Sequence, residues 1–152
     1  MKMNLSDLQK QGWIRPFKAG VSQAKDRLNL AKRDIATARK LLGSDSDWAF
    51  SIAYNAVLQA ARALMFAKGW RPATGEGQHM AAVRFAEAVL GKELGDEIYL
   101  FDKMRSKRHR VIYDVSGCVS KQEAKSAFDF AIHFVETVEK YLQKNSQIEK
   151  AF

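Results

Sequence analysis

Apolar residues of this chain recur at alternating three- and four-residue steps, which is the spacing of one face of an α-helix. The clearest case lies near the N-terminus, where the rule is followed by Val21, Ala24, Leu28, Ala31, Ile35, Ala38 and Leu42. Ser22 is a suitable N-cap for such a helix, and Gly43 is a suitable stop. The pattern predicts an amphipathic helix between these two residues.

The next segment, "SDWAFSIAYNAVLQAARALMFAKGW", is rich in alanine, leucine and aromatic residues. Its alanines repeat at helical steps, at Ala49, Ala53, Ala56, Ala60, Ala63 and Ala67. Such small side chains allow neighbouring helices to approach closely, and the apolar residues spread almost all round the helix. We therefore expect this segment at the centre of a helical bundle rather than on its rim.

Glycines and prolines divide the rest of the chain into further segments of helical length. We expect a small helix around Leu5 to Trp13, a helix from His79 to Leu90, a fourth long helix from Leu94, and a fifth from Ser120 to about Asn145. The stretch "RPATGEGQ" is expected to be a loop, and the polar tail after Gln143 is expected to fray. Since no segment carries a strand signal, the predicted fold class is an all-α helical bundle.

Length and charge limit the possible organisation and partners. The chain has 152 residues, 47% of them hydrophobic, and a formal net charge of +8. We expect one domain over residues 1–152, with its core at about 22–145 and an N-terminal extension at 1–20. Positive charge attracts anions, so nucleic acid, nucleotides, an acidic protein and anionic lipid all fit its sign.

Several chemistries find no support in the sequence. The single cysteine, Cys118, cannot form an internal disulfide, and no Cys/His spacing resembles a zinc site. There is no nucleophile elbow, and "TGEGQH" lacks the strand and lysine of a phosphate-binding loop. Asp129 and His133 are expected to pair on a helix surface rather than to bind a metal. We expect no cofactor, no metal, no membrane span and a cytoplasmic location.

Arginines interrupt the apolar face of the fourth helix. In steps of three and four residues this face reads Leu94, Ile98, Phe101, Arg105, Arg108 and Ile112. Because burying an unpaired guanidinium is costly, Arg105 and Arg108 need carboxylates, a partner surface or an anionic ligand. Two interpretations stay open: either the helix leaves the core after Phe101 and both arginines are solvated, or they line a basic cleft. Lys107 and Arg110 lie on other faces of this helix.

A second basic row flanks the apolar face of the first long helix, where Lys25, Lys32 and Arg39 recur at seven-residue steps. If this row borders the fourth helix, the two sets form a groove that follows phosphates. His109 and Tyr113 would then be available to stack on bases or to hydrogen-bond. The alternative is that the row consists of ordinary solvated side chains beside a core face.

Three stretches together resemble the HEPN domain (higher eukaryotes and prokaryotes nucleotide-binding): the helix "AYNAVLQAARALMFAKGW", the glycine-containing loop after it, and "RSKRHRVIYD" near the end of a later helix. The resemblance runs from about Ala24 to Leu142. It implies an up-and-down bundle of four to five helices, usually a homodimer. Many members of the family are metal-independent ribonucleases, others are partners of minimal nucleotidyltransferases in toxin–antitoxin pairs, and some have been assigned nucleotide binding.

By position, the resemblance also assigns roles to individual residues. Arg108 matches the motif arginine and His109 the polar residue after it, while Tyr113 stands where the family has a catalytic histidine. The arginine would stabilise negative charge on a scissile phosphate, and the histidine would move a proton. A tyrosine whose pKa is the ordinary value of about 10 is a weak base at neutral pH, which favours an anion site over catalysis.

The sequence thus favours a HEPN-like protein that binds RNA or a nucleotide phosphate in a basic cleft, as a candidate toxin–antitoxin component. Two alternatives stay open: a metal-independent endoribonuclease, and an interaction module for a minimal nucleotidyltransferase partner. The candidate catalytic residues are Arg108, His109 and Tyr113. The candidate nucleic-acid or nucleotide-binding residues are Arg105, Lys107, Arg110 and Lys32.

Overall fold

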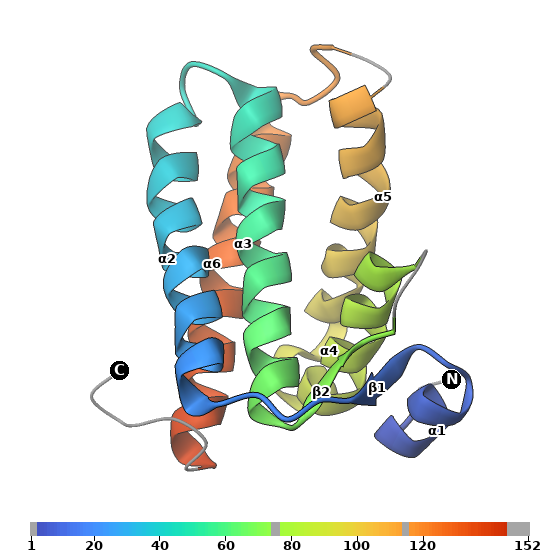
Figure 1. The fold of residues 1–152 in the computed structure, drawn as a ribbon. Helices are drawn as coiled ribbons and strands as arrows, with labels where there is room; N and C mark the ends of the chain where they lie inside the picture. The colour runs from blue at the N-terminus through green and yellow to red at the C-terminus, as the bar shows by residue number, and fades with distance from the viewer. Residues whose placement is uncertain (1–2, 74–76, 114–115, 146–152) are drawn as a thin grey trace.

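Five long α-helices make up most of the part of the chain that the computed structural model describes, residues 3–73, 77–113 and 116–145. They are α2 (Val21–Leu41), α3 (Ser46–Ala67), α4 (Gln78–Leu94), α5 (Tyr99–Tyr113) and α6 (Lys121–Lys144). Helices α2 and α3 run in opposite directions, and so do α5 and α6 (Figure 1). The predicted all-α bundle is therefore confirmed.

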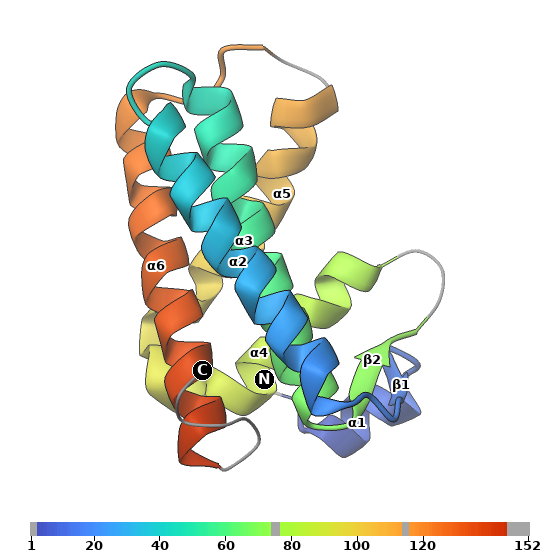
Figure 2. The ribbon, with the colours of Figure 1, turned by 60° about the vertical axis from the view of Figure 1, so that its left-hand side comes forward.

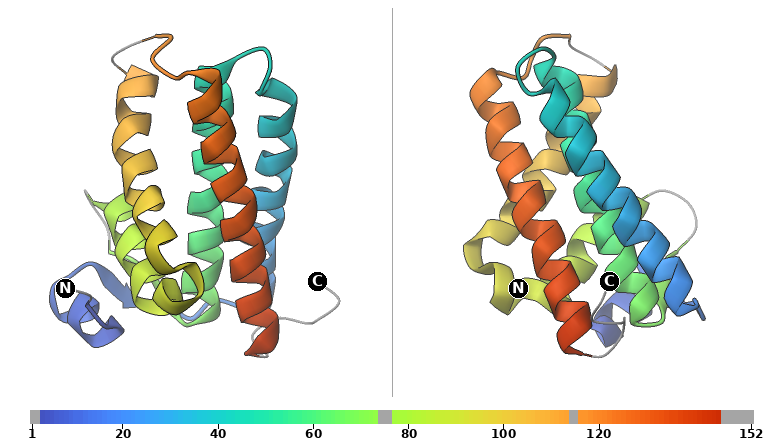
Figure 3. Two further views of the ribbon diagram at one scale, coloured as in Figure 1. Left: turned by 180° about the vertical axis from the view of Figure 1, so that it is seen from behind. Right: turned by 90° about the vertical axis from the view of Figure 1, so that its left-hand side faces the viewer.

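Helix α3 is the central element of the bundle. It lies between α2 and α5, and α6 packs across it (Figures 1 and 3). Its interior alanines are 0% exposed, namely Ala49, Ala53, Ala56, Ala60 and Ala63. Because these side chains add little bulk, α2, α4, α5 and α6 all contact α3 directly. The predicted central position is confirmed.

Helix α2 begins slightly earlier than its sequence suggests, because its N-cap is Gly20 rather than Ser22. The backbone of Gly20 is extended, and its N–H donates to the side-chain oxygen of Gln23 at 3.1 Å. This contact satisfies the Gly20 N–H, as the side chain at the third helical position does in a capping box, while Ser22 lies inside the first turn. At its other end the helix stops at Leu41, close to the predicted stop at Gly43.

The prediction of no strands is wrong for two short segments. Strand β1 (Ile14–Pro16) pairs antiparallel with β2 (Trp70–Pro72). Each strand is three residues long and ends in proline, so neither shows the alternation that identifies a strand in sequence. With α1 (Leu5–Lys10), which matches the expected small helix, they lie together at one end of the bundle (Figure 2).

The predicted loop "RPATGEGQ" therefore begins inside β2, and residues 74–76 lie outside the described part of the chain. Pairing of the strands connects the N-terminal segment to the start of α4. An additional backbone bond, from Ala73 N–H to the Trp13 carbonyl at 3.0 Å, extends this connection toward α4.

The boundary between the third and fourth long helices lies later in the sequence than predicted. Helix α4 continues through Gly91 to Leu94, and a 3₁₀ turn, η1 (Gly95–Ile98), precedes α5. A glycine within a helix costs only about 1 kcal/mol, so Gly91 does not end it. Gly95 does, because its φ of 56° leaves the helical region.

Helix α6 agrees with its prediction. Ser120 is the N-cap, and its hydroxyl accepts from the Glu123 N–H at 3.0 Å. The expected fraying falls mostly on residues 146–152, which lie outside the described part of the chain. Within the described ranges, no helix has the length and apolar character needed to cross a bilayer.

Candidate phosphate-binding site

The arginine Arg108 packs on a buried tyrosine of the central helix. Its guanidinium carbon lies 5.7 Å from the centroid of the Tyr54 ring, an arrangement in which a cation faces an aromatic π system. Tyr54 is fully buried in α3. The Nε atom of Arg108 is also buried, and it has no hydrogen-bond partner among the described residues. The side chain is thus held by packing while one of its donors stays unsatisfied.

A histidine from a third helix completes this contact. The hydroxyl oxygen of Tyr54 lies 3.0 Å from Nδ1 of His79, the second residue of α4. Gly77, the N-cap of α4, has a φ of +86°, and a Cβ there would come 3.2 Å from the Trp13 ring. Only glycine fits this position without strain. The turn at Gly77 therefore starts α4 where His79 can reach Tyr54.

Two further arginines affect the protonation of Tyr54 and His79. The charges of Arg108, Arg105 and Arg62 all favour the ionised form of Tyr54, but burial outweighs them and raises the pKa of its hydroxyl. Burial, and after it the same three arginines, lowers the pKa of His79 below 6.5. At neutral pH the tyrosine is therefore protonated and the imidazole neutral. We call Tyr54, Arg62, His79, Arg105 and Arg108 the Arg108 centre.

The Arg108 centre carries excess positive charge. Among the described residues, the carboxylate that acts on this group is that of Asp102, which accepts from Nε of Arg105 at 2.8 Å. The first turn of α4 contains no acidic residue, so its free backbone N–H groups add partial positive charge beside His79. Within the described part of the chain, Arg62 and Arg108 form no ion pair, and phosphate is an anion with the geometry that guanidinium prefers.

The Tyr54–His79 contact permits two proton arrangements with different chemistry. If the Tyr54 hydroxyl donates to Nδ1, the imidazole proton sits on Nε2, and the ring can donate to an anion. If Nδ1–H donates to the Tyr54 oxygen instead, Nε2 carries a free lone pair and can accept a proton. The first arrangement suits binding of a phosphate, and the second suits general-base chemistry.

The predicted residues at the end of α5 lie away from this contact. His109, Arg110 and Tyr113 are exposed, and the ring of His109 packs on that of Tyr113 with centroids 5.1 Å apart. Tyr113 is 68% exposed. Of the residues predicted on α5, the structure thus brings Arg105 and Arg108 together on one face and leaves these three on another.

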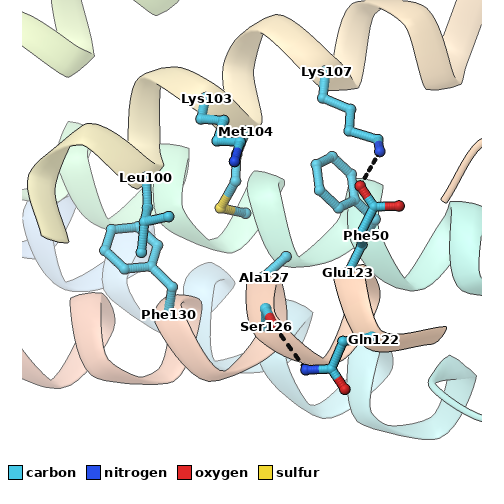
Figure 4. Close-up of a pocket in the computed structure, with 10 residues that line it drawn as sticks. All are labelled: Phe50, Leu100, Lys103, Met104, Lys107, Gln122, Glu123, Ser126, Ala127 and Phe130. Atoms are coloured by element: carbon cyan, nitrogen blue, oxygen red, sulfur yellow. Dashed lines mark hydrogen bonds and ion pairs between the residues drawn. The ribbon is translucent and has the colours of Figure 1, made fainter. Parts of the chain in front are cut away.

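Lys107 is engaged on the opposite face of α5. Its ammonium group forms an ion pair with Glu123 of α6 and lowers the pKa of that carboxyl (Figure 4). The pair borders a hollow of about 320 Å³ between α5 and α6, which also receives Phe50 and Phe130. Lys107 is therefore not part of the Arg108 centre.

Lys32 also lies elsewhere. Its ammonium group contacts the Glu139 carboxylate of α6 at 2.5 Å. Since α3 lies between α2 and α5, the basic row of α2 borders α6 instead of the fourth predicted helix (Figure 3). The basic row of α2 and the arginines of α5 therefore do not form the groove that was expected if they were neighbours.

The predicted Asp129–His133 pair is wrong in its partners. Asp129 accepts from Lys125 at 2.6 Å, whereas Nε2 of His133 lies 3.2 Å from a Glu97 carboxylate oxygen. Lys125 lies one turn before Asp129 on α6, and Glu97 belongs to η1. Helical spacing alone does not decide which of several charged neighbours a side chain contacts. No group of three His, Cys, Asp or Glu residues in the described ranges is arranged to hold a metal ion.

Sequence reasoning missed Tyr54, Arg62 and His79. Tyr54 and Arg62 stand two helical turns apart on the same side of α3, which is a detectable signal within an otherwise apolar helix. His79 follows the glycine-containing loop directly, at the start of a helix, where polar groups often bind anions. These two features would have suggested a site between α3 and α4.

The lowered pKa of His79 predicts a pH dependence of stability. In the unfolded chain the imidazole takes up a proton near pH 6.5, so below that pH the unfolded state binds more protons than the folded state. The stability that depends on a neutral His79 is fully present above pH 6.5, and it is lost as the pH falls toward the pKa of His79 in the folded protein. Between about pH 7.5 and about pH 5.5, the free energy of unfolding in urea should fall less for His79→Gln than for the wild type. An identical fall in both proteins would contradict the assigned pKa direction.

These observations define the protein as an all-α helical bundle with a cluster of arginines between its helices. A model of the HEPN domain family matches residues 24–141, well over half of the chain, and the chain belongs to this family. No curated protein matches it. Family membership supports a general function related to nucleotides or RNA.

Proposed function

We propose that the Arg108 centre binds a phosphate of RNA or of a nucleotide. The observation that carries this proposal is the set of three arginines that act on Tyr54, to which the described residues oppose the carboxylate of Asp102. Partly buried guanidinium groups without a carboxylate partner are stabilised by an anion that accepts their hydrogen bonds. Arg105 and the neutral His79 stand beside Arg108, and both can donate to the same phosphate.

Replacing Arg108 with alanine tests this proposal. Loss of a charged hydrogen-bond donor should weaken binding of single-stranded RNA by about 10- to 150-fold. The slope of log affinity against log salt should become shallower by about 0.7 for each phosphate that the variant no longer neutralises. Fluorescence anisotropy over a series of salt concentrations measures both quantities.

Lys140→Ala is the matched control, because it removes the same charge from an exposed position of α6. Unchanged affinity and slope in a folded Arg108→Ala protein would contradict the proposal. Competition with a nucleoside monophosphate in the same assay separates the two ligands: a nucleotide site releases the RNA, and an RNA site retains it.

As a second function we propose metal-independent RNA cleavage, which is favoured by the position of His79 in the Arg108 centre. With Nδ1–H donating to Tyr54, Nε2 of His79 accepts the proton of a ribose 2′-hydroxyl. The 2′-oxygen bonds to phosphorus, the bond from phosphorus to the 5′-oxygen breaks, and water gives the 5′-oxygen its proton. Arg108 stabilises the charge that develops on the phosphoryl oxygens.

This mechanism leaves a 2′,3′-cyclic phosphate on one fragment and a 5′-hydroxyl on the other. Incubation of the purified protein with RNA in excess chelator should yield these ends, since no metal takes part in the reaction. Absence of cleavage at every protein concentration would exclude the enzymatic function and would leave the binding function standing.

A further inference from the structure

Trp13, in the N-terminal segment, packs against α4, the helix that carries His79. A Cβ placed on Gly77, the N-cap of this helix, would come within 3.2 Å of Cζ3 of the Trp13 ring. About two turns further along α4, the guanidinium carbon of Arg84 lies 5.3 Å from the centroid of the same ring. This is the arrangement of a cation that faces an aromatic π system. One side chain thus contacts α4 at its N-cap and again within the helix.

The backbone of Trp13 is itself held on both sides. Its N–H donates to the carbonyl of Leu8 in α1 at 3.0 Å, and its carbonyl accepts from the Ala73 N–H at 3.0 Å. Leu8 is fully buried, and Ile14, which follows Trp13 and begins β1, is buried as well. The ring is therefore attached to a backbone that both α1 and the segment after β2 fix in place beside α4 (Figure 2).

Trp13 and Tyr54 contact α4 on different sides of the helix. Arg84 follows His79 by five residues, which places the two side chains about 140° apart around the helix axis. Arg84 faces the Trp13 ring, and His79 faces the Tyr54 hydroxyl. The first two turns of α4 are therefore held between one ring of the N-terminal segment and one ring of the central helix α3.

We propose that Trp13 is a positioning residue of the Arg108 centre, which fixes the start of α4 so that His79 stays against Tyr54. The expected effect on RNA rests on the phosphate-binding function proposed above. Trp13 lies before residues 24–141, the part of the chain that the family model matches, so this support comes from a segment that the model does not cover. Loss of the ring would free Gly77 and Arg84 and let the imidazole move away from the Tyr54 hydroxyl.

The protonation of His79 reports where its imidazole lies. Among the described residues, the charged and titratable groups that act on it are Tyr54 and Arg62 of α3 and Arg105 and Arg108 of α5. Burial contributes most to the lowered pKa of His79, and the three arginines contribute after it. An imidazole that moves toward water loses part of both effects, so the pKa of His79 should then rise toward 6.5.

The test measures the pKa of His79 in the whole chain by NMR titration of its imidazole resonances, which His79→Gln assigns. Trp13→Ala should raise this pKa toward 6.5, and Trp13→Phe, which keeps an aromatic ring, should return it toward the wild-type value. Trp13→Ala should also bind single-stranded RNA about 2- to 10-fold more weakly at about pH 7.5, because the neutral imidazole no longer donates to the phosphate. Fluorescence anisotropy measures this affinity.

Phe17→Ala is the matched control for general loosening of the N-terminal segment. Phe17 follows β1, and its ring centroid lies 5.2 Å from that of Phe66 in α3, so the substitution weakens the same segment without removing the Trp13 ring. It should leave the pKa of His79 unchanged, and an equal rise in both variants would overturn the positioning role. If Trp13→Ala does not fold, Trp13→Leu, which keeps an apolar side chain, takes its place with the same expected rise.

The remaining outcomes separate failure of the positioning role from failure of the phosphate site. An unchanged pKa of His79 in a folded Trp13→Ala protein overturns the positioning role, whatever its RNA affinity. A raised pKa with wild-type RNA affinity, while Arg108→Ala binds weakly, supports the positioning of His79 and contradicts its contact with the phosphate. Unchanged affinity of Arg108→Ala contradicts the phosphate site itself, and the pKa of His79 then still decides whether Trp13 positions the imidazole.

Discussion

Replacing His79 with glutamine is expected to lower metal-independent RNA cleavage by about 10²- to 10⁴-fold, the usual contribution of a positioned general base. Glutamine keeps a hydrogen-bonding group toward the Tyr54 hydroxyl but cannot carry a proton at neutral pH. Because Arg105 and Arg108 remain in place, RNA binding should change much less than cleavage. The rate of formation of 2′,3′-cyclic ends at saturating protein, measured in chelator, separates the chemical step from binding.

The other two histidines of the chain provide the comparisons. His133→Gln is the matched control, because His133 is exposed on α6 and pairs with Glu97. His109→Gln tests the role that the family resemblance gives to the residue after the motif arginine. If His109→Gln abolishes cleavage and His79→Gln does not, His79 is not the base, and a proton acceptor at the exposed end of α5 takes its place.

Periodicity predicted the helices well because each buries a face of regular spacing. The alanines of α3 indicated a central helix, and this helix is indeed contacted by its neighbours on all sides. The arginines at positions 105 and 108 interrupted an apolar face, and the structure places both on the buried side of α5 with Tyr54. The two charged residues that the sequence places on an otherwise apolar helix face therefore belong to the candidate site.

The partners of those arginines could not be predicted from the same pattern. Periodicity defines which face of a helix is buried but not which helix covers it, so the basic row of α2 was associated with α5 although it borders α6. His79, which contacts Tyr54, lies in the first turn of α4 directly after the positive φ at Gly77. Such a turn is a three-dimensional feature that the spacing of apolar residues does not encode.

Phe101→Ala is the second substitution with a large expected effect, here on stability. The Phe101 ring is fully buried, with its centroid 6.1 Å from that of Tyr54 and 5.4 Å from that of Phe134. It therefore connects α5 to both α3 and α6. Removing it leaves a cavity at this junction, which should lower the free energy of unfolding by about 3–5 kcal/mol. Urea denaturation measures the loss, and Tyr99→Ala, at an exposed position of the same helix, should stay within about 0.5 kcal/mol of the wild type.

The same substitution tests whether packing positions the phosphate-binding arginine. Phe101 and Arg108 both contact the Tyr54 ring, and residues that share a partner show coupled effects when both are changed. Phe101→Leu, which keeps an apolar side chain and should remain folded, is suited to a double-mutant cycle with Arg108→Ala on RNA affinity. If α5 needs the aromatic contact to hold Arg108 against Tyr54, Phe101→Leu weakens binding in the wild-type background and has little further effect once Arg108 is removed. Strictly additive effects would mean that Arg108 is positioned independently of the core beneath it.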